Sequence, residues 1–257
     1  MHEEMFLNNQ ISSNLITLSK YHFIAGPRYG DLDIGDKGLG RLIEPNELND
    51  CINKSKGKVI VTSGPTVEPI DDVKVISNKS SGKQGRALAV ELNSKGYEVI
   101  YIHSSLIQPI PGIKNKTFST SEELFVAISS EMKNTVSVFM TAAVSDFVVN
   151  KADGKISRHN GKLNIELTPN KDIIASIKSE YPDVEYIAFS AQVNDDLNFD
   201  KIKSKNVDYL VINNILNNDF GSDVNKIAII NHEELIYKSE TLSKNEIAQA
   251  ILINLDY

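Results

Sequence analysis

The sequence predicts an α/β fold in which helices cover both faces of a doubly wound, mostly parallel sheet. Two observations support this prediction. Short apolar runs typical of buried strands alternate with amphipathic segments of helical period between residues 58 and 254. A stretch rich in small and polar residues, 64–85, joins the first such strand to the first such helix. In doubly wound sheets that position commonly binds a ligand.

The length and charge of the chain restrict the class of protein. It has 257 residues and a formal net charge of −7, so one substantial core is possible and no basic surface for nucleic acid or an anionic membrane is expected. The single cysteine, Cys51, cannot form an intrachain disulfide. No apolar run reaches the roughly 18 residues of a membrane helix, and no signal segment is recognisable. We therefore expect a cytoplasmic enzyme.

The expected strands and helices follow one another along the chain. Apolar runs predict strands at 59–61, 99–102, 136–140, 186–189, 209–212 and 227–230. Helical periodicity predicts helices at 86–95, 121–133, 172–180, 199–204 and 244–254, with Ser121 and Ser243 as N-caps and Gly96 as a C-terminal cap. The result is a Rossmann-like three-layer sandwich, in which the loops after residues 62, 140 and 189 converge on one crevice.

Residues 1–56 show a different pattern. They predict a helix at 12–18, a strand at 22–25, a loop through Gly30, Gly35, Gly38 and Gly40, and a helix from Glu44 to about residue 52. This segment is too short to bury its own core. Residues 54–57 read as a linker, so we expect an appendage at 1–56 and the main domain at 57–257.

The segment 80–85 predicts an anion site. Ser80, Ser81 and Gly82 offer hydroxyls and backbone N–H groups at a helix N-terminus, where phosphate binds readily. Alternatively, Ser80 is an N-cap, and Gly82 and Gly85 allow close packing of helix on sheet. Both the dinucleotide fingerprint and the Walker P-loop are absent from this stretch.

Longer motifs carry a resemblance to a known family. Gly-Pro-Thr-Val-Glu-Pro-Ile-Asp at 64–71 and Ile-Ser-Asn-Lys-Ser-Ser-Gly-Lys-Gln-Gly at 76–85 are similar to the signature of phosphopantothenate–cysteine ligase. That enzyme is the synthetase half of a bifunctional coenzyme A biosynthesis protein. The similarity continues, in the family's order, through 142–147, 154–156, 205–208 and 220–225.

This resemblance implies a two-step ligation. The carboxylate of 4'-phosphopantothenate attacks the α-phosphate of CTP, with ATP as a possible replacement. Pyrophosphate is released, and an acyl-cytidylate is formed. The amine of L-cysteine then attacks this anhydride. Two anionic substrates have to meet, so Mg²⁺ and local lysines are expected to offset their repulsion. The resemblance also implies a homodimer in which one subunit helps to close the other's site.

The resemblance assigns site residues by position. Asn78 and Lys155 match catalytic residues: the Asn78 amide would stabilise the developing oxyanion, and Lys155 would lie near the triphosphate. Read alone, Asn78 is a turn residue and Lys155 a solvated loop lysine. The matched nucleotide-binding residues are Met140, Thr141, Ala142, Asp146, Lys155, Lys171, Asp172, Ile173, Ile174, Phe189, Lys201 and Lys205. The phosphopantothenate-binding residues would be Gly64, Lys74, Asn78, Ser80, Ser81, Gly82 and Gly85; no metal ligand is assigned.

Several positions depart from the family pattern. Lys74 replaces a common arginine, which keeps the charge and loses the bidentate fork. A lysine-rich stretch becomes Ser157-Arg158, an acidic position becomes Gln192, and Ile212-Asn213-Asn214 and Lys171-Asp172-Ile173 replace two further runs. These changes concern nucleotide choice and rate more than reaction type.

The appendage resembles the C-terminal end of the phosphopantothenoylcysteine decarboxylase domain, a flavoprotein. Residues 1–6, 30–35 and 38–41 carry this likeness, but Ile34 replaces the family's catalytic cysteine. We expect neither flavin binding nor decarboxylation by this chain. The resemblance does not distinguish a natural remnant from a truncated product.

Two other function classes compete with the ligase. A nicotinamide-dependent oxidoreductase could use this fold, but no tyrosine has a lysine four positions later. A binding protein that kept the fold and lost turnover is the second alternative, motivated by the departures above.

Overall fold

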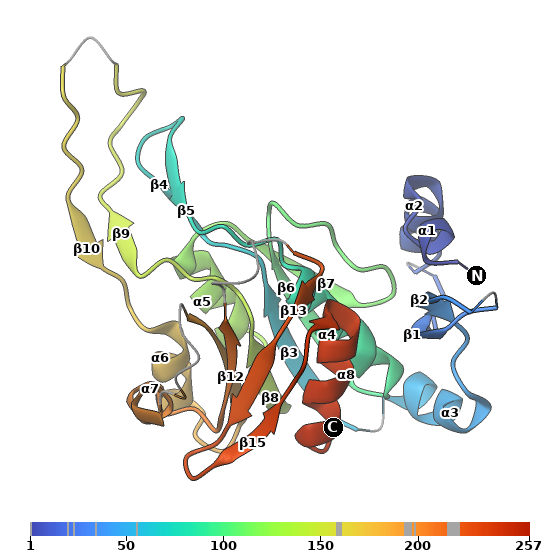
Figure 1. Cartoon of the computed structure of the whole chain (residues 1–257). Coiled ribbons are helices and arrows are strands. Elements are labelled where there is room, and N and C mark those ends of the chain that lie inside the picture. The colour runs from blue at the N-terminus through green and yellow to red at the C-terminus, as the bar shows by residue number, and fades with distance from the viewer. Residues whose placement is uncertain are drawn as a thin grey trace.

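The computed structural model bears out the predicted α/β class (Figure 1). It describes residues 2–19, 21–22, 24–33, 35–54, 56–157, 161–192, 197, 199–214 and 222–257. Its central sheet has eight strands in the order β15-β14-β12-β11-β8-β3-β6-β7. The six consecutive strands from β12 to β7 are parallel, and β14 and β15 are antiparallel. The bounds are β3 (Lys58–Ser63), β6 (Glu98–Ser104), β7 (Lys114–Phe118), β8 (Thr135–Met140), β11 (Glu185–Gln192), β12 (Tyr209–Asn214), β14 (Ile227–Ile230) and β15 (Leu235–Lys238).

The strand order creates a switch point beside β3. The chain runs from β3 outward to β6 and β7, then returns to place β8 on the opposite side of β3. Connections on the two sides of β3 therefore diverge, and a crevice opens at the carboxyl ends of β3 and β8.

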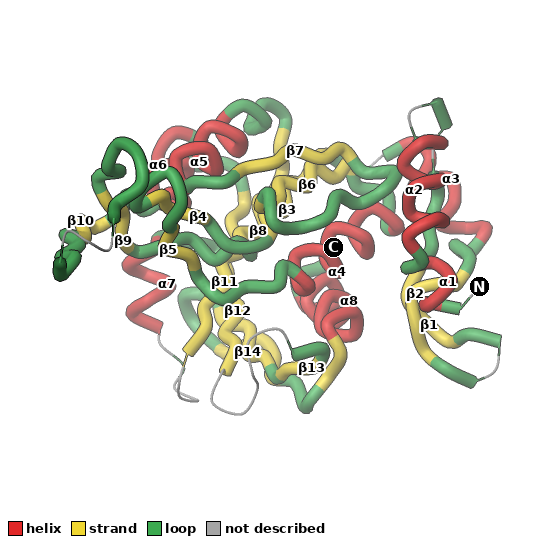
Figure 2. Tube along the Cα trace, turned by 90° about the horizontal axis from the view of Figure 1, so that it is seen from above, coloured by secondary structure: helices red, strands yellow, loops and turns green. Residues whose placement is uncertain are grey.

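Helices cover both faces of the sheet, because the strand residues alternate between two cores. Val59 and Val61 face a core that includes α4 (Lys83–Ser94) and α8 (Lys244–Asn254). Ile60 faces the other core, with α5 (Ser121–Ser129), α6 (Ile173–Glu180) and α7 (Phe199–Lys205). Figure 2 shows these two groups of helices on opposite sides of the strands.

Three small ribbons extend the carboxyl edge. Strands β4 (Val67–Pro69) and β5 (Val75–Ser77) form a hairpin, and β13 (Val224–Asn225) pairs with β16 (Leu242–Ser243). Strands β9 (Phe147–Val149) and β10 (Leu167–Pro169) are antiparallel and form the two ends of the segment 147–169, which we call the arm. In Figure 1 the arm projects well beyond the sheet.

Two predicted caps have different outcomes. Ser243 is confirmed as the N-cap of α8, where it forms a capping box with Glu246. Ser121 is not the N-cap of α5: Thr120 takes that place, and its hydroxyl accepts a hydrogen bond from Glu123 N at 3.2 Å. The edge strands β7 and β15 were not predicted, because an edge strand need not be apolar on both faces.

The appendage is more ordered than predicted. It comprises α1 (Glu3–Phe6), α2 (Asn9–Leu18), α3 (Pro45–Asn53), and a hairpin of β1 (Arg28–Asp31) and β2 (Lys37–Arg41). The predicted glycine-rich loop was wrong, since Gly30 pairs with Gly38 across this hairpin. The strand predicted at 22–25 is absent from the described residues there. Neither α1 nor α2 buries a described residue, as expected for a segment without its own core.

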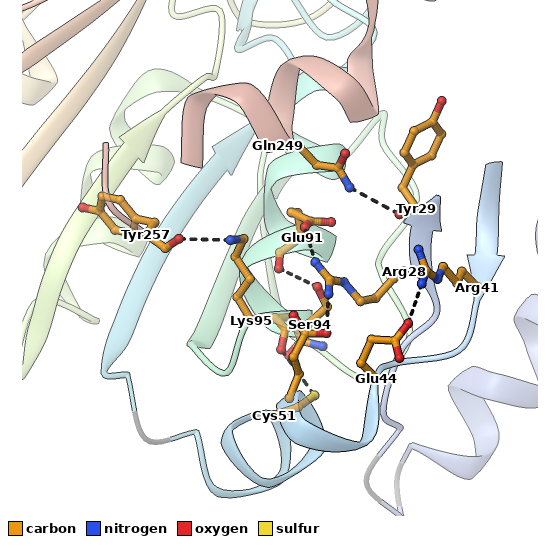
Figure 3. A network of polar contacts seen from close by, with 12 residues as sticks. Arg28, Tyr29, Arg41, Glu44, Cys51, Glu91, Ser94, Lys95, Gln249 and Tyr257 are labelled. Carbon is orange, nitrogen blue, oxygen red and sulfur yellow. Dashed lines mark hydrogen bonds and ion pairs between the residues drawn. The ribbon is translucent and has the colours of Figure 1, made fainter. Parts of the chain in front are cut away.

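The appendage is attached to α4 and α8 by polar contacts (Figure 3). The Arg28 guanidinium bridges Glu47 of α3 and Glu91 of α4, the latter at 3.0 Å. On α8, the Gln249 amide donates to the Tyr29 carbonyl oxygen at 3.3 Å. The appendage thus supports the helices that form one wall of the crevice. None of the described helices is long and apolar enough to cross a membrane.

Candidate functional site

A cleft of about 840 Å³ lies at the carboxyl ends of β3, β8 and β11. The loop 77–82 and the start of α4 form one wall. The segment 140–146 forms the floor, and α6, α7 and the end of β11 form the opposite wall. The predicted convergence of three loops is therefore found.

The α4 wall lies against the strand ends because of its glycines. The Ser63 hydroxyl donates to the Gly82 carbonyl oxygen at 2.8 Å, and Gly82 is the N-cap of α4. A Cβ on Gly85 would lie 2.8 Å from both Cβ and Oγ of Ser63 and would also collide with the Thr141 hydroxyl. Gly85 therefore allows close packing, the structural alternative considered for it, while it also lines the cleft.

Asn78 crosses from the α4 wall to the floor. Its Nδ2 donates to the carbonyl oxygens of Val144 at 2.9 Å and Ala143 at 3.3 Å. Since both acceptors are carbonyls, the nitrogen must face them. In this state the amide N–H groups hold the α4 wall against the floor. To stabilise an oxyanion, one of these bonds has to be exchanged for a bond to substrate.

The floor is held by hydroxyl groups of β3 and its loop. The Thr141 hydroxyl donates to the Thr62 carbonyl oxygen, and Ala142 N donates to Thr62 Oγ1 at 3.1 Å. Ser145 N donates to Thr66 Oγ1 at 3.0 Å. These bonds place Asp146 at the cleft, with its side chain exposed.

Lysines of α7 line the wall opposite α4. Lys201 Nζ donates to Ser190 Oγ at 2.7 Å, and Lys205 Nζ lies 3.5 Å from Asp172 Oδ2. Burial and the neighbouring Lys205 charge lower the pKa of Lys201 below its usual value. The spacing of four residues does place both ammonium groups on one wall, as predicted.

The remaining nucleotide-side residues have structural contacts of their own. Lys171 Nζ lies 3.8 Å from the centroid of the Phe125 ring. Asp172 is the N-cap of α6 and accepts from Ala175 N at 3.1 Å. Phe189 is half-buried against the α4 core and also lines the cleft.

Most residues assigned from the sequence come together in this cleft, and three do not. The lining includes Asn78, Ser80, Ser81, Gly82, Gly85, Met140, Thr141, Ala142, Asp146, Lys171, Asp172, Ile173, Ile174, Phe189, Lys201 and Lys205. Gly64, Lys74 and Lys155 lie outside it. Gly64 has φ of +85°, and a Cβ added to it would be 2.7 Å from Ile107 Cγ1.

Lys74 and Lys155 lie at the base of the arm. Lys74 Nζ lies 2.6 Å from Asp71 Oδ2 and donates to the Ile156 carbonyl oxygen at 3.0 Å. Ile156 N donates to the same Asp71 oxygen at 2.9 Å. The Lys74 ammonium and this backbone N–H hold the pKa of Asp71 well below its usual range. This buried carboxylate thereby fastens the arm to the β4–β5 hairpin, with Lys155 exposed beside it.

The structure adds cleft residues that the sequence did not single out. They are polar side chains near the α4 wall and the floor: Lys83, Asn170, Asn213, Asn225 and Lys244. Lys83 and Asn225 belong to the matched motifs at 76–85 and 220–225, so the motifs were the available signal for these two residues. Lys83 and Lys244 each begin a helix. Phe220 and Gly221, which carried part of the resemblance, lie outside the described residues, as do Ile34 and Arg158, which depart from the family pattern.

Carboxylates are sparse in the cleft. Asp146 and Asp172 line it, and the part of the chain that the structure describes contains no group of three or more His, Cys, Asp or Glu able to hold a metal ion. A metal bound here would need oxygen ligands from a substrate.

Comparison with known proteins assigns the family. Residues 55–256 match the DNA/pantothenate metabolism flavoprotein C-terminal domain. The chain belongs to this family. A solved structure of the C-terminal domain of the coenzyme A biosynthesis bifunctional protein CoaBC, 26% identical, superposes with a TM-score of 0.63 over 77% of this chain and 95% of that one. The structure of the DNA/pantothenate metabolism flavoprotein from Streptococcus pneumoniae is 21% identical and superposes with a TM-score of 0.67 over 78% of this chain and 98% of that one. This similarity supports the fold.

Full-length relatives of this flavoprotein C-terminal domain extend the match. The coenzyme A biosynthesis bifunctional protein CoaBC of Vibrio cholerae is 30% identical over 98% of this chain and 67% of its own length. A cysteine/cysteine sulfinic acid decarboxylase of an unknown prokaryotic organism is 31% identical over 98% of this chain and 76% of its own length. The chain spans 64% of the related CoaBC protein of Haemophilus influenzae. Membership therefore connects the chain with coenzyme A biosynthesis.

Proposed function

We propose that the chain is a phosphopantothenate–cysteine ligase. It would join 4'-phosphopantothenate to L-cysteine through an acyl-nucleotidylate, with CTP as the nucleotide and pyrophosphate as the leaving group. One observation carries the proposal: a single cleft at the switch point brings the α4 wall, Asp146 and the Lys201–Lys205 pair together. An enzyme that joins two anionic substrates needs such a cleft, with cations on its walls.

The nucleotide is assigned to the α6–α7 wall. Lys201 and Lys205 supply positive charge for the triphosphate, and the half-buried Phe189 offers an aromatic face to the base. Binding of phosphate would offset the burial that lowers the Lys201 pKa. Nothing in this wall selects cytosine by itself, so CTP rather than ATP rests on the resemblance.

The acyl substrate is assigned to the α4 wall. Its carboxylate would lie between Asn78 and the nucleotide's α-phosphate. In the first step a carboxylate oxygen forms a bond to that phosphorus, and the bond to the pyrophosphate oxygen breaks. In the second step the cysteine nitrogen bonds to the acyl carbon, and CMP leaves.

Asn78 would act in the second step. Its bond to the Ala143 carbonyl, 3.3 Å, is longer than the bond to Val144, so it is the weaker of the two. An oxyanion that replaced the Ala143 oxygen would receive a donor already aligned by Val144. This exchange would stabilise charge that exists only after the amine has attacked.

Mg²⁺ fits the residues present. Asp146 makes no side-chain hydrogen bond or ion pair within the described ranges and can contribute one carboxylate, while the nucleotide's phosphates supply the other ligands. When bound, the ion would offset charge on the phosphates.

Lys155 would enter the cleft of a second copy of the chain. The arm that carries it is fastened to the β4–β5 hairpin and projects beyond the sheet (Figure 1), and Lys155 does not line the cleft of its own chain. The arm also exposes apolar side chains, namely Phe147, Leu163, Ile165 and Leu167. We propose a homodimer in which each arm is covered by the other subunit and Lys155 enters the partner's site.

The test is pyrophosphate release with 4'-phosphopantothenate and each of four nucleoside triphosphates, with and without cysteine. We expect release with CTP, and formation of the cysteine amide only when cysteine is present. Asn78→Ala should still release pyrophosphate in one turnover while forming at least about 100-fold less amide. This split separates a second-step residue from one that only binds nucleotide.

The alternative is a non-catalytic protein that binds nucleotide or phosphopantothenate. It predicts binding of one ligand without pyrophosphate release from any triphosphate, and that result would exclude the ligase. For the appendage we propose a decarboxylase-like remnant without its flavin site, which would not contribute to ligation chemistry.

A further inference from the structure

The loop between β6 and β7, residues 105–113, packs against both ends of the segment that carries Asn78. That segment runs from Gly64 to Gly82, which have φ of +85° and +70°. A Cβ on Gly64 would lie 2.7 Å from Ile107 Cγ1, and a Cβ on Gly82 would lie 3.0 Å from Ile107 Cδ1. One side chain of the loop therefore lies against the two points at which the segment leaves β3 and enters α4.

Arg86 of α4 holds this loop. Its Nη1 donates to the carbonyl oxygens of Gln108 at 3.1 Å and Pro109 at 3.3 Å. These two residues directly follow Ile107 in the chain. Pro109 and Pro111 stiffen the loop, because the ring of each proline fixes its own φ. Holding the two carbonyl groups therefore also holds Ile107 in place.

The Arg86 side chain occupies an unfavourable place for a cation. It is half-buried near the N-terminus of α4, where the helix dipole is positive. Burial lowers the pKa of Arg86 below its usual value, and the nearby Tyr101 phenol opposes this shift. No carboxylate of the described residues forms an ion pair with this guanidinium. Its hydrogen bonds to the loop are therefore the contacts that offset its burial.

The loop is connected to one wall of the cleft. Arg86 and Ile107 do not line the cleft themselves, but Asn78, Ser80 and Ser81 of the supported segment do. Ile110 of the loop belongs to the core that contains α4, whereas α6 and α7 pack in the other core. A displaced loop should therefore disturb the α4 wall and leave the α6–α7 wall in place.

We propose that Arg86 is a positioning residue for the ligation. Through the β6–β7 loop and Ile107 it fixes the segment 64–82, and with it the wall to which the acyl substrate is assigned. This inference rests on the proposed ligase function for the identity of the substrate. A displacement of about 1 Å at a reacting group can reduce the rate about 100-fold, so a residue outside the cleft can matter for turnover.

The first experiment is steady-state kinetics with both substrates. Arg86→Met should lower kcat/KM for 4'-phosphopantothenate about tenfold, with the KM for CTP within about twofold of wild type. Arg86→Lys keeps a donor for the loop carbonyls and should recover at least half of this loss on a logarithmic scale. Lys95→Met is the matched control: Lys95 is a half-buried cation at the other end of α4, and its Nζ donates to a Tyr257 carboxyl-terminal oxygen at 3.1 Å.

The second experiment is a double-mutant cycle, measured by calorimetric titration with 4'-phosphopantothenate in the absence of nucleotide. Ile107→Ala removes no charge and should weaken binding as Arg86→Met does. Because both act on the same contact, the double variant should bind within about twofold of the weaker single variant. If Ile107→Ala does not fold, Ile107→Val is used, since it removes only Cδ1. Leu106→Ala is the control, because Leu106 is 67% exposed in the same loop.

Three results would overturn the inference. Additive losses in the cycle would show that Arg86 acts through its own charge rather than through Ile107. An equal loss with Lys95→Met, or an equal rise in the KM for CTP, would show a general loss of stability. Failure of the wild type to bind 4'-phosphopantothenate would remove the substrate that Arg86 is inferred to serve.

The two experiments separate this inference from the proposed function. If the wild type releases no pyrophosphate with any triphosphate, the ligase is excluded. A cycle that still shows coupling between Arg86 and Ile107 in the binding of 4'-phosphopantothenate would then support positioning of the α4 wall by itself.

Discussion

Gly85 shows how one residue can serve both packing and the site. It lies in the first turn of α4, within contact distance of Ser63 at the end of β3 and Thr141 after β8. The absence of a side chain lets the helix start meet both strand ends. The position of the cleft's α4 wall depends on this contact, because Ser80, Ser81 and Gly82 directly precede helix α4.

Gly85→Ala is expected to destabilise the protein. In an open helix position this change would add about 1 kcal/mol of stability. Here the new methyl must displace Ser63 or Thr141, so we expect a net loss of about 1 to 2 kcal/mol and weaker 4'-phosphopantothenate binding. Urea denaturation and calorimetric titration measure the two effects.

The control is Gly35→Ala in the appendage. Gly35 has φ of +86°, and a Cβ added there would have no neighbouring atom within 4 Å. The substitution should cost about 1 kcal/mol through backbone strain alone and leave substrate binding unchanged. A Gly85→Ala protein as stable as wild type would contradict the packing argument.

At the scale of elements, the arm carries residues away from the cleft although they directly follow the cleft floor in the sequence. Residues 141–146 form the floor of the cleft, yet the chain directly after them leaves as β9 and carries Lys155 away. Asp71 and Asp72, both after the β4 strand, anchor this departure through Lys74, Ile156 and Lys151. A fastened arm is suited to contact a second subunit.

A heterodimer tests whether the arm acts in its partner's cleft. One subunit carries Asn78→Ala and the other Lys155→Ala, each with a different affinity tag for purification. If Lys155 serves the partner, one cleft of the heterodimer lacks both residues and the other is intact. Ligase activity should then be about half that of the wild-type dimer.

Each homodimeric variant serves as the inactive control. If Lys155 acts within its own subunit, every cleft in the heterodimer lacks one residue, and the activity should stay at the level of these controls. A monomer in sedimentation experiments would also exclude the arrangement.

At the scale of the whole molecule, the appendage contacts and supports the main part of the chain through α4. Glu91, whose side chain is 5% exposed, receives the Arg28 guanidinium from β1. Cys51 of α3 is buried and donates to the Asn93 carbonyl oxygen at 3.5 Å. Because α4 also forms one wall of the cleft, the appendage and the cleft share one helix.

Arg28→Met should therefore lower the free energy of unfolding. Breaking a fully buried ion pair costs about 3 to 5 kcal/mol, and Arg28 retains 18% side-chain exposure. We expect a loss of about 2 kcal/mol in urea denaturation. The double variant Arg28→Met, Glu91→Met should recover at least half of it, because no buried carboxylate is left without a partner.

Arg41→Met is the matched control. Arg41 and Glu44 pair at 2.5 Å, but each side chain is 46% exposed. A pair this exposed contributes at most about 1 kcal/mol. Equal losses for the Arg28 and Arg41 variants would show that burial of Glu91 does not determine the effect.

The sequence determined the fold class and the cleft's location, because both depend on local patterns. Alternation of apolar runs with helical segments predicts a parallel sheet, and loops at strand carboxyl ends then meet at its switch point. The motifs at 78–85 and 140–146, with Lys201 and Lys205, contain many of the residues that line the cleft, and the ligand roles assigned to them stay predictions. Local patterns did not predict the β1–β2 hairpin, since its glycines read equally well as a loop.

Only the tertiary structure decided which lysines share the cleft. Lys244 lies 161 positions after Lys83, and their proximity results from the packing of α8 on α4. Lys155, matched with equal ease from its motif, instead lies on the arm, which buried Asp71 fastens through Ile156 and Lys74. Short motifs specify residue types and local turns, whereas the distance between two charges depends on how the elements pack. That packing is why the set of charges that line the cleft follows only from the folded chain.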